Sequence, residues 1–392
     1  MNGITTRSKE LFKLYEELAG TREDLGPVDL AADKSLEAIY AASQWQLLWR
    51  KFIRNKVAIA GGVVILLYYL SALFAGFLAP YTLSTRFVEY IYLPPQRIHF
   101  INEGKFQPFV YDVRLTIDKN LRKIYEPDPT KKVPLRFFAH GEPYKLFGLI
   151  ETDVHLFQAP GAIVSLLGTD RQGRDMFSRI LYGSQISLTI GLLGVFLSLF
   201  FGSVLGVVSG YYGGWVDNLI QRLIELVRSF PAIPLWMALS AAVPPHWPPL
   251  RTYFVVTLIL SLIGWTWLAR QLRGKVLALR NEDFVLAAKL AGASDARIIF
   301  RHLIPATFSH IIVVSTLAMP AMILAETALS FLGLGLRPPV TSWGVLLQEA
   351  QNLQSIALYP WVFTPAAAIA IAILAFNFLG DGLRDASDPY TL

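Results

Sequence analysis

Long uncharged stretches separated by polar segments run through most of this chain. A helix that crosses a membrane needs about 20 apolar residues, and six stretches approach or exceed that length: 57–79, 186–209, 218–243, 252–269, 311–336 and 361–380. The first half of 218–243 carries three charged residues, so we expect it to lie inside the protein or near lipid headgroups. The pattern therefore predicts an all-α polytopic membrane protein with six transmembrane helices.

Residues 81–167 interrupt this pattern. The segment is polar, rich in proline and aromatic residues, and alternates apolar with polar side chains at 109–115. A period of two is typical of strands separated by turns. We therefore expect a first transmembrane helix within 51–80, a small and mostly β insert at 81–167, and five further spans within 168–392.

Basic residues indicate the orientation, because lysine and arginine gather on the cytoplasmic side of membrane proteins. Residues 50–56 hold four such residues, and residues 270–302 hold seven against three acidic ones. Both segments are predicted to be cytoplasmic. Residues 1–50 would then form a cytoplasmic extension, the insert would be extracytoplasmic, and both termini would be cytoplasmic.

The composition favours a lipid bilayer as solvent. Of the 392 residues, 54% are hydrophobic and 16% are charged, against about 25% charged in soluble domains. The net charge of +6 lies beside apolar stretches, whereas a nucleic-acid binder would carry a basic stripe interleaved with aromatic residues; we therefore expect no nucleic-acid partner.

The search for chemistry predicts no catalytic site, cofactor or metal. The chain has no cysteine, and its six histidines lack the spacing of metal ligands. It contains no G-x-x-x-x-G-K-[ST] loop to wrap a phosphate. If ATP drives this protein, another chain must bind it.

Residues 281–305 predict two short helices joined at a glycine. Asn281 or Asp283 could cap the first helix, Gly292 suits a left-handed stop, and Pro305 would limit the second helix.

The first of these helices carries small side chains at Ala287, Ala288 and Ala291. They would allow its backbone to press closely into a partner. From these residues alone, an ordinary helical hairpin and a docking helix remain equally open.

Glu326 places a carboxyl group inside the fifth predicted span. Such a group is costly in a membrane and usually faces the helix bundle or water. It could pair within the structure, line a transport path, or lie near the external end of the helix before Gly333.

The loop resembles the cytoplasmic "EAA" loop of ABC importer permeases, since Leu286-Ala287-Ala288, Gly292 and Pro305 fall on its spacing. Leu286 replaces the glutamate of that pattern. In the family this loop is the coupling helix that docks on the ATPase. The resemblance implies a cytoplasmic coupling loop at 273–306, with coupling residues Ala287, Ala288, Gly292, Arg297 and Pro305.

Three further blocks, at 168–175, 210–217 and 326–335, resemble the dipeptide, oligopeptide and nickel permeases of the same family. The first block either forms a turn and cap that starts the second span or serves as a periplasmic gate or binding-protein contact. Its candidate residues are Gly168, Thr169, Asp170, Gly173, Arg174 and Asp175.

The resemblance implies a type I ABC importer permease of the cell inner membrane that forms half of a path for peptides or a related solute. The implied partners are a second homologous permease, two cytoplasmic ATP-binding subunits and an extracytoplasmic solute-binding protein. The sequence does not separate peptide, oligosaccharide and nickel as substrates. An ion-coupled secondary transporter or channel is the alternative; interrupted helices in two matching halves would favour it, and no such repeat is visible.

Overall fold

The computed structural model describes residues 44–117, 123–244 and 246–387, which fall into two units. The first unit ends at Arg54, and its described part is the helix α3 (Gln44–Arg54). Residues 1–43, most of the expected cytoplasmic extension, lie outside the described residues. The second unit, from Asn55, contains everything discussed below.

Among the described residues of the second unit, five apolar helices are long enough to cross a membrane. They are α4 (Lys56–Leu73), α6 (Met176–Tyr212), α9 (Pro249–Leu279), α13 (Phe308–Phe331) and the run Pro360–Ser387, which joins the short η4 (Pro360–Phe363) to α16 (Thr364–Ser387). The predicted fold class, a mostly helical polytopic protein with a small β insert, is confirmed.

The third predicted span is broken in the structure. It consists of α7 (Gly214–Ser229) and α8 (Ala232–Ala241), which meet at an angle of 82°. Pro231 stands at the break, and proline cannot donate the backbone hydrogen bond that would continue a helix. The count of six spans holds only if this bent pair is one span.

The insert consists of two antiparallel sheets. One has the strand order β1 (His99–Asn102), β2 (Lys105–Ile117), β3 (Lys123–Pro134), and the other pairs β4 (Arg136–Leu146) with β5 (Ile150–Gln158). Val110 and Val133 of the first sheet and Phe157 of the second belong to one buried apolar cluster. The short α5 (Ala75–Leu78) and η1 (Val88–Tyr90) lead from α4 into the insert.

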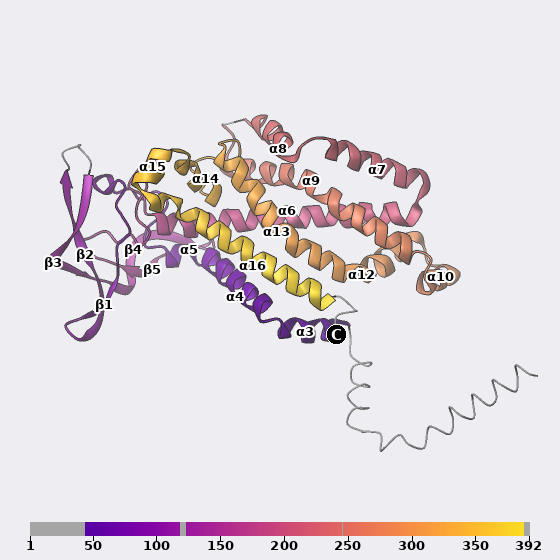
Figure 1. Ribbon diagram of the computed structural model, residues 1–392, viewed down its shortest axis with the longest axis horizontal. Coiled ribbons are helices and arrows are strands. Elements are labelled where there is room, and N and C mark those ends of the chain that lie inside the picture. The colour runs from indigo at the N-terminus through magenta and orange to yellow at the C-terminus, as the bar shows by residue number, and fades with distance from the viewer. Residues whose placement is uncertain (1–43, 118–122, 245, 388–392) are drawn as a thin grey trace, which may run out of the picture. The chain divides into compact units, whose positions relative to one another are not determined.

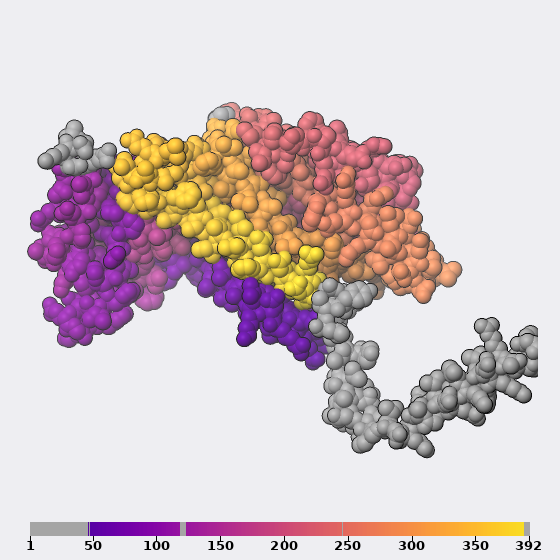
Figure 2. Space-filling model, viewed as in Figure 1, coloured from indigo at the N-terminus to yellow at the C-terminus, as the bar shows by residue number. Residues whose placement is uncertain are grey.

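Two ends of the helices carry the remaining elements, as Figure 1 shows. The end with strands β1–β5, here called the sheet end, also holds α14 (Trp343–Gln348), η3 (Glu349–Gln351) and α15 (Leu353–Leu358). The opposite end, here called the loop end, holds α10 (Asp283–Leu290), α11 (Asp295–Arg297), η2 (Ile298–Leu303) and α12 (Ile304–Ala306). In Figure 2 the yellow atoms of the C-terminal segment lie directly against the purple atoms of the insert.

Helix α6 connects the two ends. It has 37 residues, which at 1.5 Å per residue makes it about 55 Å long. Gly202, Gly206 and Gly210 lie along one side of it, and a Cβ atom on each would stand 2.6–2.9 Å from a backbone oxygen of α9. Small residues at four-residue intervals let membrane helices pack closely, so α6 and α9 are in backbone contact.

Candidate functional site

The turn at 168–175 is fixed by its own backbone. Gly168 and Gly173 adopt positive φ angles of 78° and 70°. Asp170 Oδ1 accepts hydrogen bonds from the backbone nitrogens of Gln172 at 2.7 Å and Arg174 at 3.0 Å. A Cβ atom at Gly173 would overlap the carbonyl oxygen of Phe87. Only glycine fits there, because both the backbone conformation and the space exclude a side chain.

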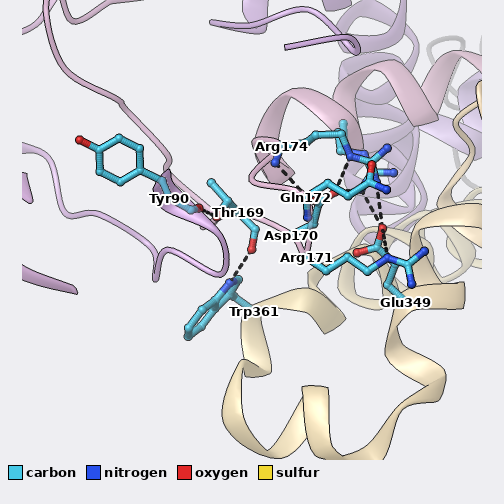
Figure 3. Close-up of polar contacts among 9 residues, drawn as sticks. Tyr90, Thr169, Asp170, Arg171, Gln172, Arg174, Glu349 and Trp361 are labelled. Carbon is cyan, nitrogen blue, oxygen red and sulfur yellow. Dashed lines mark hydrogen bonds and ion pairs between the residues drawn. The ribbon is translucent and has the colours of Figure 1, made fainter. Parts of the chain in front are cut away.

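Charged side chains gather directly on this turn, and we call Asp170, Arg171, Arg174, Arg179 and Glu349 the arginine cluster. Asp170 Oδ2 accepts from Arg174 Nε at 2.7 Å and from the Arg179 guanidinium. Glu349 Oε1 accepts from Arg174 at 2.9 Å and from Arg179 at 3.3 Å, and it lies 4.0 Å from Arg171 Nε. Figure 3 shows Asp170, Arg171 and Arg174 of the turn beside Glu349 of η3.

Within the arginine cluster Asp170 and Arg179 are buried, Arg174 and Glu349 are mostly buried, and Arg171 is exposed. The side chains of Asp170 and Arg179 are 0% and 4% exposed, and that of Glu349 is 9% exposed. Removing one member of a buried ion pair costs about 3–5 kcal/mol, because the remaining charge is left uncompensated. The cluster therefore locks the turn and the start of α6 to η3, a segment about 175 residues further along the chain.

Thr169 joins the same turn to the insert and to η4. Its hydroxyl donates to the carbonyl of Tyr90, and its own carbonyl accepts from the indole nitrogen of Trp361 at 3.0 Å. Beside it, the rings of Tyr92 and Tyr359 stack with centroids 3.9 Å apart. Three distant parts of the chain thus meet at this residue (Figure 3).

Asp175 caps the N-terminus of α6. Its Oδ2 accepts from the backbone nitrogen of Ser178 at 2.7 Å and the Ser178 hydroxyl at 2.6 Å, while Oδ1 accepts from the Ser165 hydroxyl at 2.7 Å. Burial raises the pKa of the Asp175 carboxyl above its ordinary value, and the hydrogen bonds from Ser178 and Ser165 oppose that rise. The structure thus brings the six candidate residues of the turn, from Gly168 to Asp175, into one connected site.

Glu326 lies one turn before the end of α13 and is fully buried. Its Oε1 accepts from Ser330 at 2.8 Å and Ser342 at 2.6 Å, and its Oε2 accepts from Ser187 at 3.3 Å. The Ser187 hydroxyl in turn accepts from the backbone nitrogen of Trp343 at 3.0 Å. Glu326 therefore connects α6, α13 and the start of α14 at the sheet end.

At the loop end, Gly292 ends α10 with a φ of 76°, as its position in the sequence suggested. The Ser294 hydroxyl caps α11 by accepting from the backbone nitrogen of Arg297 at 3.4 Å. Two details differ from expectation. Glu282 occupies the N-cap of α10 without a side-chain hydrogen bond, and the second helix continues through Pro305 as a π turn and α12.

The small residues of α10 face different ways. Ala288 packs against the buried cluster that includes Val276 and Ile298, whereas Ala287 and Ala291 are exposed. Arg297 and Pro305 are exposed as well. The exposed side also presents Leu290, which is 90% accessible in the isolated chain, so this surface is available to a partner.

Tyr211, in the last turn of α6, connects that helix to the loop end. Its hydroxyl donates to Asp295 at 2.6 Å, and the Lys289 ammonium lies 5.1 Å from the centre of its ring. Lys289 is exposed and contacts α6 through this ring. Asp217 of α7 accepts two hydrogen bonds of 2.6 Å each from Arg273 of α9. This ion pair joins α7 to α9.

Sequence reasoning missed Arg179, Glu349 and Trp361 as parts of the site. Glu349 had a signal, since it is the only charged residue between Arg337 and Asp381. Within the described residues, no group of three or more His, Asp or Glu side chains is placed to hold a metal ion.

Two family models match the chain. The one described as binding-protein-dependent transport system inner membrane component matches residues 202–391, and the one described as the N-terminal TM domain of oligopeptide transport permease C matches residues 43–95. A chain of the MetNI methionine ABC transporter superposes with a TM-score of 0.41 at 16% identity, over 54% of this chain and 97% of that one.

Among curated proteins, the glutathione transport system permease protein GsiD of Pectobacterium atrosepticum is 33% identical over 365 residues, covering 93% of this chain and 96% of that protein. The dipeptide permease DppC of Alkalihalophilus pseudofirmus is 42% identical over 223 residues, which cover 57% of this chain and 71% of that protein. The oligopeptide permease OppC of Bacillus subtilis is 36% identical over 223 residues, which cover 57% of this chain and 70% of that protein. The family resemblance seen in the sequence is confirmed: this chain belongs to the binding-protein-dependent transport system inner membrane component family, among its dipeptide, oligopeptide and glutathione permeases.

Proposed function

We propose that this chain is a permease subunit of an ATP-driven importer and forms half of the transmembrane path for peptides or a related solute. A second homologous permease completes the path, two ATP-binding subunits dock on the cytoplasmic side, and an extracytoplasmic binding protein delivers the solute. Family membership and the roles of the relatives as dipeptide, oligopeptide and glutathione permeases support this proposal.

The charge pattern supports one orientation in the inner membrane. The loop end, with seven basic against three acidic residues in 270–302, faces the cytoplasm together with both termini. The sheet end and its insert then face outward. In this orientation α10 is the coupling helix, with Ala287, Ala288, Gly292, Arg297 and Pro305 in the loop that meets the ATPase.

The observation that carries the proposal is the continuity of α6. One end of this helix is capped by Asp175 and places Arg179 in the arginine cluster, while the other end places Tyr211 against Asp295 of the coupling loop. A displacement of the loop by the ATPase would be transmitted along one helix of about 55 Å to the outer turn. The turn at 168–175 thereby serves as a gate, and Glu326 holds α14 in place beside it.

The test uses Gly292→Val in the assembled transporter. Valine resists the positive φ of this position, so the variant should retain insertion and binding-protein docking but lose uptake and binding-protein-stimulated ATP hydrolysis. Gly104→Val is the matched control, because Gly104 has a φ of 79°, open space around it, and a place in the insert; this variant should transport normally.

Tyr211→Phe offers a milder version, since it removes only the hydroxyl that reaches Asp295, and it should weaken the link between ATP hydrolysis and uptake. Full transport by Gly292→Val with the ATPase still bound would remove the coupling assignment. Uptake that persists without ATP hydrolysis and follows an ion gradient would instead establish a secondary transporter.

A further inference from the structure

A cavity of about 1160 Å³ opens at the sheet end, over the arginine cluster. Its walls come from the turn at 168–175, from residues 82–86 that follow α5, from the end of β4 and from the segment between α13 and η3. Cavities of about 300–1,000 Å³ bind small molecules in proteins. The space is therefore large enough for a small solute with some water.

The lining has more positive than negative charge. Arg174 and Arg179 are neutralised by Asp170 and Glu349, and Lys145 at the rim pairs with Glu151 at 3.4 Å.

Two guanidinium groups remain. Arg171 is 63% exposed, and the one ion pair described for it is the 4.0 Å approach to Glu349, which two other arginines already share. Arg86 is exposed and makes no ion pair within the described residues. The carboxyl of Glu142, outside the lining, is bound by the hydroxyls of Thr82 and Thr85.

Hydrogen-bonding capacity is also unused at the cavity floor. Arg179 Nε, Glu349 Oε2 and Gln172 Oε1 are buried and have no hydrogen-bond partner among the described residues. All three residues line the cavity. Buried polar atoms without partners are rare in folded proteins and call for a ligand, water or ion. Of the three atoms, Arg179 Nε is a donor that can meet an anion directly, whereas the two oxygens are acceptors that need a water molecule or an N–H group.

We propose that this cavity binds a carboxylate group of the transported solute, such as the C-terminal carboxylate of a peptide, through Arg171 and Arg86. The proposal rests on the function proposed above. A guanidinium group presents paired N–H donors that match the two oxygens of a carboxylate. Both arginines line the cavity, which has room for a small solute beside them, and this favours a small solute over an acidic loop of a docked protein.

The first experiment measures the potential inside the cavity and needs no transport. Because the chain has no cysteine, Ser84→Cys in the cavity wall gives one reactive site on this subunit. The assembled complex is treated at low salt with the anionic reagent MTSES or the cationic reagent MTSET, and modification of this chain is followed by mass. Gln354→Cys, exposed on α15 outside the cavity lining, is the control.

The ratio of anionic to cationic rates should be higher at Ser84→Cys than at Gln354→Cys. One charge about 6 Å from the cysteine sulfur in a water-like medium changes the rate of each charged reagent about three-fold, in opposite directions, and so changes the ratio of the two rates about ten-fold. The effect becomes smaller as salt screens the charge. Adding Arg86→Gln and Arg171→Gln should return the ratio to the control value. Equal ratios at the two cysteines would overturn the proposal.

The second experiment tests occupancy. Glycyl-leucine should slow modification of Ser84→Cys by the anionic reagent MTSES, because the bound carboxylate both occupies the cavity and offsets its positive charge, whereas glycyl-leucinamide, which lacks the carboxylate, should not. Arg171→Gln should abolish this protection. Equal protection by both compounds, no protection by either, or protection by the binding protein alone would each overturn the carboxylate site. Since neither readout depends on turnover, a failure here is distinguishable from a failure of the Gly292→Val test of coupling.

Discussion

Replacing Glu349 by glutamine should loosen the arginine cluster with little change in shape. The parent cluster sets three arginines against two carboxylates, and the variant sets the same three against Asp170 alone. Glu349 Oε1 accepts two hydrogen bonds from guanidinium groups, and a hydrogen bond to a charged group contributes about 1.5–3 kcal/mol. The amide oxygen still accepts a neutral hydrogen bond, so we expect Glu349→Gln to cost about 2–3 kcal/mol. Glu349→Ala, which leaves Asp170 as the one carboxylate of the cluster and removes the acceptor that Arg174 and Arg179 share at Glu349, should approach about 3–5 kcal/mol.

The assay measures the thermal stability of the assembled complex. Its readout is the fraction of the complex that remains monodisperse after heating. Glu349→Gln should lower the midpoint by several degrees, while Glu151→Gln should change it little, because that carboxylate is 78% exposed in a surface ion pair. Adding Arg174→Gln to Glu349→Gln leaves two arginines against Asp170, which restores the parent's excess of one positive charge in the cluster. The double variant should therefore lose less than the sum of the single losses, with a coupling of about 0.5–3 kcal/mol. Strict additivity would refute a coupled cluster.

Three further changes test other parts of the structure. Gly173→Ala should sharply reduce the yield of folded protein in membranes, because its Cβ atom would overlap the Phe87 carbonyl, whereas Gly104→Ala, with a similar φ and open space, should cost only the backbone strain. Glu326→Gln should transport almost normally because the surrounding serine hydroxyls can reorient, but Glu326→Lys should fail to assemble, since an unpaired charge inside a span costs about 2.5–3.5 kcal/mol; equal behaviour of the two in uptake and assembly would contradict the buried network. Thr116→Cys, exposed on β2, should react with an impermeant maleimide in intact spheroplasts, and labelling only after lysis would reverse the proposed orientation.

The fold was largely predictable because its main signal is local. Uninterrupted apolar runs predict spanning helices wherever they occur, and the alternation at 109–115 predicted the strand β2. The broken third span was harder to foresee. Its average composition is sufficiently apolar, but the bend depends on Pro231, and a proline within a membrane helix can also be tolerated, as Pro320 is in α13.

The site was predictable only in part because half of it comes from distant segments. The turn at 168–175 was visible as a motif, but its ionic partner Glu349 lies about 175 residues away and belongs to no motif. A lone carboxylate in an uncharged stretch indicates that a partner exists without saying where. The contrast with Glu326 shows the limit, since that equally isolated carboxyl hydrogen-bonds three serines and not an arginine.

The packing of α6 determines what kind of motion could connect the loop end to the arginine cluster. Gly202, Gly206 and Gly210 bring the backbone of α6 into contact with that of α9. Sliding one helix along the other would therefore push the backbone of α9 against the side chains that flank these glycines on α6. Arg273 of α9 also holds Asp217, just beyond the end of α6. The pair α6 and α9 is therefore expected to move as one rigid body, and a tilt at the loop end would displace Arg179 at the other end. Such a tilt strains the contacts of Arg179 with Asp170 and Glu349, which are the contacts that a gate would have to break.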